Sequence, residues 1–73
     1  MSDFARPRYY VTVVNADRQG FLLGPYITHK EARENVTRGR DLACEVDAYA
    51  RFYLFGTART VRRVKTVFGR EMP

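Results

Sequence analysis

The side chains that most often act in catalysis are few in this chain, and their spacing keeps them apart. Cys44 and His29 are the only cysteine and the only histidine, and Ser2 is the only serine. On one helix, the separation between His29 and Cys44 amounts to about 22 Å at roughly 1.5 Å per residue. A Cys–His pair therefore does not form within the chain, and one cysteine with one histidine does not fill a four-ligand zinc site.

Paired carboxylates are the second possible source of chemistry. Glu31 with Glu34 and Asp41 with Glu45 lie on the solvent side of the same predicted helix, interleaved with arginines. General acid–base catalysis needs two carboxyl groups that converge on a cleft and have separated pKa values. Phosphate-loop and dinucleotide-binding motifs are also absent from the sequence. We therefore expect a protein that is not an enzyme and that has no metal site, cofactor or small-molecule substrate.

Arginine near aromatic residues is the chemistry that remains. The chain has 13 Lys and Arg against 8 Asp and Glu, a net charge of +5. Residues 59–73 hold five of the basic side chains and one acidic side chain, a net +4. Such a segment attracts polyanions by counterion release, and arginine makes forked contacts with phosphate. A solvated tail that only keeps the protein soluble is the alternative.

These features predict binding of nucleic acid or another polyanion through the basic C-terminal segment. The predicted side chains are four cations for phosphates and two aromatic rings for bases: Arg59, Arg62, Arg63, Lys65, Tyr53 and Phe55. Stacking of a base on an aromatic ring contributes about 1–3 kcal/mol. The alternative is a protein-interaction module, a homodimer or an inhibitor of a host protein, that uses an exposed aromatic face of the sheet.

Length and composition predict a single small domain over residues 1–73, with a loose leader at 1–7 and a loose tail at 69–73. The hydrophobic fraction of 45 % and charged fraction of 29 % are typical of globular chains. At this length the core is thin. No apolar run is long enough to span a bilayer, and the N-terminus lacks the apolar stretch of a secretory signal. With one unpaired cysteine, a cytoplasmic location without a membrane partner is expected.

Three strands are predicted from β-branched and aromatic runs. Residues 8–14 are apolar on both faces, which is typical of a central strand. A polar connection at 15–20 leads to a short strand at 21–23, and Gly24 with Pro25 should end its pairing. A third strand is predicted at 49–55, weakened or bulged at Gly56. Residues 57–68 fit a helical or an extended structure, and their β-branched content favours an extended fourth strand.

The strongest local signal is a helix over residues 29–46. Thr28 and Glu31 have the spacing of a capping box, and Ile27 can pack against Ala32. Small and apolar residues then recur at intervals of four and three. Gly39 lies on that apolar stripe, where it either lets the sheet approach closely or marks a kink.

The predicted fold is α+β, in the order ββαβ(β): an antiparallel sheet of three or four strands with one helix packed on one face. The expected strand order is 2-1-3. The other face of the sheet should also be covered, either by the C-terminal segment folding back or by a second copy of the chain.

Two resemblances add expectations. Residues 23–32, LGPYITHKEA, resemble the beginning of the helix in sporulation-related repeat (SPOR) domains. That resemblance implies a strand–turn–helix, and such domains bind glycan strands of peptidoglycan on a ribonucleoprotein-like sheet. In length, basic charge and general pattern the chain looks like small uncharacterised proteins of bacteriophages and prophages, which implies an accessory role.

Overall fold

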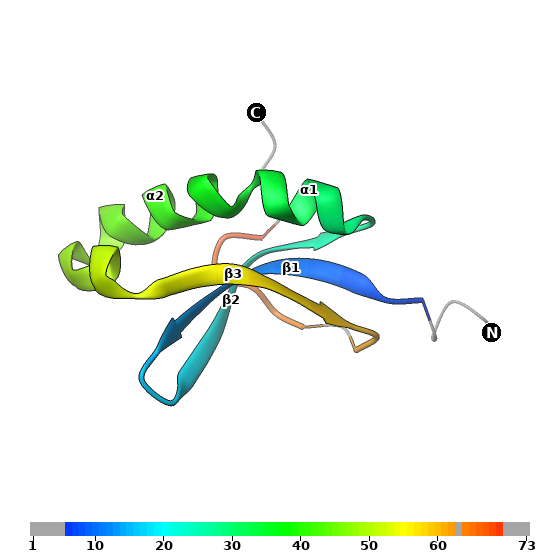
Figure 1. Ribbon diagram of the computed structural model, residues 1–73, viewed down its shortest axis with the longest axis horizontal. Helices are drawn as coiled ribbons and strands as arrows, with labels where there is room; N and C mark the ends of the chain where they lie inside the picture. The colour runs from blue at the N-terminus through cyan, green and yellow to red at the C-terminus, as the bar shows by residue number, and fades with distance from the viewer. Residues whose placement is uncertain (1–5, 63, 70–73) are drawn as a thin grey trace.

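The computed structural model describes residues 6–62 and 64–69 and has an α+β fold. One antiparallel sheet has the strand order β2-β1-β3, and a helical layer lies over one of its faces (Figure 1). This architecture confirms the predicted fold class and strand order. The elements in chain order are β1 (Arg8–Asn15), β2 (Arg18–Tyr26), α1 (His29–Glu34), α2 (Val36–Val46), the 3₁₀ helix η2 (Ala48–Phe52) and β3 (Leu54–Thr60).

Strand β1 is the central strand, as its two apolar faces predict. Val11 on one face and Tyr10 on the other are both fully buried. Val11 packs under α2, because a Cβ added to Gly39 would lie 2.8 Å from Val11 Cγ1. Glycine is thus required where the helix crosses the sheet, which confirms that interpretation of Gly39.

The helix begins at the predicted residue. The Thr28 hydroxyl accepts a hydrogen bond from the Glu31 N–H at 3.2 Å, and Glu31 Oε1 accepts one from the Thr28 N–H at 3.3 Å. This is the capping box that the sequence predicts. Ile27, which was expected to pack against Ala32, is instead 66 % exposed, while Ala32 is fully buried.

The helix predicted over 29–46 is present but is interrupted at Asn35, where α1 ends and α2 begins. The Asn35 side-chain amide donates to the Glu31 carbonyl at 2.7 Å. That carbonyl would otherwise accept the Asn35 backbone N–H, which donates instead to the Ala32 carbonyl at 3.0 Å. The side chain thus replaces one helical hydrogen bond and turns the chain between the two helices.

The prediction of a third strand at 49–55 is wrong in its limits. Residues Ala48–Phe52 form η2, and β3 begins only at Leu54. Asp47 explains the shift, because its Oδ1 accepts the Tyr49 N–H at 2.9 Å and so caps the 3₁₀ helix. Gly56, predicted to weaken the end of a strand, lies inside β3 opposite Thr12.

Strand β2 is longer than the predicted 21–23. It pairs with β1 from Arg18 onward through a two-residue turn, in which Ala16 has φ of 58°. Pairing does not end at Gly24 and Pro25. A shift of register carries the chain past them, and Tyr26 pairs with Tyr9.

The C-terminal segment folds back along the sheet. Beyond Thr60 the chain leaves β3, and the Val64 N–H donates to the Tyr10 hydroxyl at 3.3 Å. Residues 67–69 then run along the outer edge of β2, through hydrogen bonds from Val67 to Phe21, from Phe68 to Leu22 and from Gly24 to Gly69. Of the predicted fourth strand at 57–68, residues 57–60 belong to β3, residues 61–62 form a bend and residues 64–68 belong to this covering segment. Residues 1–5 of the predicted leader and 70–73 of the predicted tail lie outside the described residues.

Candidate nucleic-acid interface

Arginines gather where β1 begins and β3 ends. The antiparallel register places Arg8 opposite Thr60 and Tyr9 opposite Arg59. Four arginines therefore belong to this end of the sheet, toward which the tip of the β3 arrow points in Figure 1. We call it the basic end and define it by Arg6, Arg8, Arg59 and Arg62. It draws its charge from two segments that lie about fifty residues apart in the sequence.

A hollow of about 370 Å³ opens at the basic end, between β1, β3 and the start of α1. His29 Nε2 lies 3.0 Å from the Thr57 hydroxyl, and the His29 ring stacks on Tyr9 with centroids 5.5 Å apart. Arg59 stands beside these rings, because it is the strand partner of Tyr9. The lining residues are Tyr9, His29, Thr57, Ala58 and Arg59.

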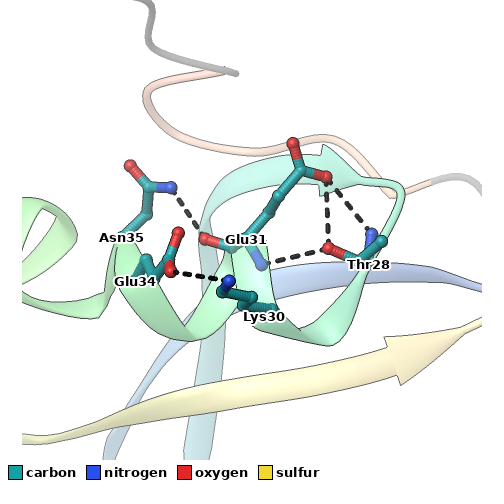
Figure 2. A network of polar contacts seen from close by, with 5 residues as sticks. All are labelled: Thr28, Lys30, Glu31, Glu34 and Asn35. Atoms are coloured by element: carbon teal, nitrogen blue, oxygen red, sulfur yellow. Dashed lines mark hydrogen bonds and ion pairs between the residues drawn. The ribbon is translucent and has the colours of Figure 1, made fainter.

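The capping box positions His29. Figure 2 shows Thr28 and Glu31 joined by reciprocal hydrogen bonds at the first turn of α1, directly beside His29 in the chain. The same turn carries the ion pair between Lys30 and Glu34, whose charged atoms lie 4.0 Å apart on exposed side chains. Arg59 is the cation that lines the hollow together with His29.

The cations predicted to bind phosphates are exposed, but they do not share one face. Arg59 lies on the helix side of the sheet with its partner Tyr9. Arg62 lies at the bend after β3, where its N–H donates to the Thr60 hydroxyl at 3.1 Å. Lys65 follows Val64, which is bonded to Tyr10 on the other side of the sheet. The basic segment thus wraps around the end of the sheet, and Arg63 lies outside the described residues.

No carboxylate neutralises the described cations of the basic segment. Within residues 6–62 and 64–69, neither Arg59 nor Arg62 nor Lys65 forms an ion pair. Exposed guanidinium groups without a protein carboxylate remain available to an external anion.

The two predicted stacking residues lie at the opposite end of β3. Phe55 is four strand residues from Arg59, about 13 Å at roughly 3.3 Å per residue, and it packs against the core. Tyr53 precedes β3, and its hydroxyl donates to Asp47 Oδ2 at 3.0 Å. That hydrogen bond, with desolvation and the Asp47 charge, raises the pKa of Tyr53 above 10.0. The structure therefore does not bring these two rings to the basic end.

The rings that do lie at the basic end, Tyr9 and His29, were not among the predicted site residues. Their association depends on the strand register, which places Tyr9 opposite Arg59, and on the hydrogen bond between His29 and Thr57. A third strand at 49–55, as predicted, does not include Arg59 and so could not place it opposite Tyr9. The capping box is the one sequence feature that indicates the position of His29, because it makes this residue the first of α1.

The aromatic sheet face of the alternative hypothesis is covered at its centre. Tyr10 is fully buried and makes an edge-on contact with Phe21, with centroids 5.4 Å apart. Several large exposed apolar side chains lie elsewhere, around η2 and β3. They include Tyr49, Phe52 and Leu54, each about 70 % exposed.

The described residues hold neither a cluster of metal ligands nor a membrane-spanning helix. Among them, no three His, Cys, Asp or Glu side chains lie close enough to hold a metal ion together. None of the described helices has the length and apolar character needed to cross a membrane. Cys44 is half-buried and packs against the core.

No family model, curated protein or solved structure matches this chain. The resemblances to SPOR domains and to small phage proteins therefore stay predictions, and the function must be argued from the geometry of the basic end.

Proposed function

We propose that this protein is a non-enzymatic accessory module that binds single-stranded nucleic acid at the basic end. The observation that carries the proposal is the position of Arg59, an unpaired cation beside the stacked rings of Tyr9 and His29. A nucleotide offers a phosphate and a flat base close together. The hollow is lined by one arginine and two aromatic rings, the groups that bind a phosphate and a base.

Electrostatics supply most of the expected affinity. Arginines that neutralise phosphates release condensed counterions, so binding should weaken steeply as the salt concentration rises. Two acidic side chains of α1 have partners within that helix turn: Glu34 pairs with Lys30, and Glu31 caps α1. Among the described residues Arg59 and Arg62 form no ion pair with a carboxylate, so their charges are available to an external anion.

Stacking supplies the preference for single strands. The bases of a duplex are already stacked, whereas unpaired bases can lie on Tyr9 or His29 at about 1–3 kcal/mol each. The Thr57 hydroxyl, which bonds His29, fixes the ring in place. Since every base has a flat face, the expected sequence preference is small.

The test is the binding of labelled single- and double-stranded oligonucleotides at two salt concentrations. Replacing Arg59 and Arg62 with alanine should weaken binding by roughly tenfold for each arginine and lower the salt dependence. The matched control replaces Arg18 and Arg40, two exposed arginines outside the basic end, and removes the same charge. Binding that is absent at low salt, or equal weakening in both double variants, would contradict the proposal.

A second variant separates stacking from charge. Replacing His29 with alanine removes one ring while it leaves every arginine in place. We expect weaker binding of single strands, unchanged binding of duplexes and an unchanged salt dependence. An equal loss for both forms of nucleic acid would mean that the rings do not contact bases.

A further inference from the structure

Strand β3 is an open edge of the sheet. It lies at one end of the strand order, and in Figure 1 it passes in front of the other two strands with the helices above it. Among the described residues, its backbone forms hydrogen bonds with β1 and with no other segment. An antiparallel edge strand directs about half of its N–H and C=O groups outward, where they can pair with another extended chain.

The sequence of β3 does little to prevent such pairing. Edge strands are commonly protected by proline, lysine or inward-pointing charges. Residues Leu54–Thr60, LFGTART, contain no proline and no lysine, and Arg59 is the only charged residue. Apolar side chains flank both ends of the strand: Leu54 is 72 % exposed and Phe52 69 % exposed at its start, and Val61 is 56 % exposed just beyond its end.

We propose that the β3 edge pairs with the β3 edge of a second copy of this chain. The two strands run antiparallel about a two-fold axis at Thr57, the register that pairs every residue of the strand. The two three-stranded sheets then join into one continuous sheet with both helical layers on the same face. The inference does not depend on the proposed nucleic-acid binding.

The composition of the strand favours its own copy over another partner. In an antiparallel two-fold pairing, the start of one strand meets the end of the other. In this register the exposed Leu54 of one copy lies opposite the partner's Thr60, and the exposed Val61 lies just beyond that pair, opposite the partner's Tyr53. Arg59 lies opposite the partner's Phe55, and no two like charges face each other.

The pairing would also change the hollow at the basic end. Arg59 lines that hollow, and the partner's Phe55 would come next to it on the helix side of the sheet. Both hollows of the dimer would open on the same face. One strand of nucleic acid could then contact both, which would raise its apparent affinity without any new contact in either copy.

The test is analytical ultracentrifugation of two double variants with the wild type, over a wide range of protein concentration. In the proposed register Leu54 faces the partner's Thr60. The variant L54K/T60K therefore places lysine opposite lysine at two points, and the matched variant L54K/T60E places lysine opposite glutamate. We expect a concentration-dependent dimer for the wild type and for L54K/T60E, and a monomer for L54K/T60K.

Two outcomes would overturn the inference: a wild type that remains monomeric at the highest concentration, or a dimer that survives in L54K/T60K. Backbone NMR of the wild type gives a second measurement that needs no variant. With increasing concentration, the amide signals of residues 54–60 should shift more than those of 20–24 at the other edge. Equal shifts at both edges, or none, would count against pairing through β3.

Discussion

The two edges of this small sheet are treated in opposite ways. The outer edge of β2 is closed by the protein's own C-terminal segment, through three backbone hydrogen bonds of 2.9–3.1 Å. The outer edge of β3 carries no backbone segment among the described residues, and the exposed Leu54 lies at its start. The difference shows that the two edges of one small sheet can have different degrees of backbone hydrogen bonding. Residues 67–69 pair with one edge of the sheet, and the other edge is left available for recognition.

The two edges also differ in how tightly the backbone is packed. Gly24 in β2 has φ of 130°, and a Cβ added to it would lie 2.7 Å from Tyr10 Cδ2 and 3.0 Å from the Tyr9 carbonyl oxygen. A Cβ added to Gly56 in β3 would meet nothing within 4 Å. The same glycine-to-alanine change therefore probes a position of β2 that is crowded by the central strand β1 and an open position of β3.

The largest expected effect is that of Gly24→Ala. We expect the free energy of unfolding to fall by about 3 kcal/mol or more, because alanine is strained at this φ and its methyl group overlaps Tyr10. Gly56→Ala should change it by less than about 1 kcal/mol and in the stabilising direction, since the unfolded chain loses freedom. Urea denaturation of both variants measures the difference. Similar losses in the two would mean that the surroundings of Gly24 and Gly56 are not packed differently.

The covering segment should contribute through its side chain as well as its backbone. Phe68 is half-buried and packs against the core, so Phe68→Ala should lower the free energy of unfolding by about 2 kcal/mol. Leu54→Ala at the open edge removes a side chain that is 72 % exposed and should cost no more than about 0.5 kcal/mol. Thermal unfolding followed by circular dichroism compares them. A Phe68→Ala variant as stable as Leu54→Ala would show that residues 66–69 add little to the fold.

A smaller effect is expected where the covering segment crosses the face of the sheet. The buried Tyr10 hydroxyl accepts the Val64 N–H at 3.3 Å. Tyr10→Phe should cost about 1 kcal/mol and speed the exchange of the Val64 amide hydrogen. The control is Tyr49→Phe, at a ring that is 71 % exposed, which should leave stability unchanged. An unchanged Val64 exchange rate in Tyr10→Phe would contradict this contact.

The smallest effect concerns the start of the open edge, where Tyr53 leads into β3. Its hydrogen bond to Asp47 raises the pKa of the phenol above 10.0, the value for an unfolded chain. A raised pKa in the folded state means that this stabilisation is present below about pH 10 and is lost as the pH rises through the folded-state pKa. An NMR titration of the Tyr53 ring should give a lower midpoint in Asp47→Asn and the same midpoint in the control Asp17→Asn. A midpoint that Asp47→Asn does not move would rule out the hydrogen bond as the cause.

Local signals in the sequence were sufficient for part of the fold. The capping box of Thr28 and Glu31 and the two apolar faces of residues 8–14 follow from short patterns, and both are present in the structure. Short sequence patterns do not predict the structure where a single side chain competes with the regular backbone hydrogen bonds. Asn35 bonds the Glu31 carbonyl and interrupts the helix, and Asp47 caps η2 where a strand was expected.

The candidate site was less predictable because it depends on register. The concentration of charge in residues 59–65 is visible in the sequence, but its division between the two sides of the sheet is not. Tyr9 and His29 join Arg59 only once the start and direction of β3 are known. A shift of a few residues in the third strand, as the sequence alone suggested, removes that association entirely.

The central claim, that one edge of the sheet is closed by the chain itself and the other is open, is tested most directly by amide hydrogen exchange in dilute protein. The account predicts slow exchange for the amides of Gly24, Val67 and Phe68, which donate across the β2 edge. It predicts fast exchange for alternate amides along β3, whose outward N–H groups meet only solvent when the chain is monomeric. Uniform protection along β3, or fast exchange at Val67 and Phe68, would contradict it.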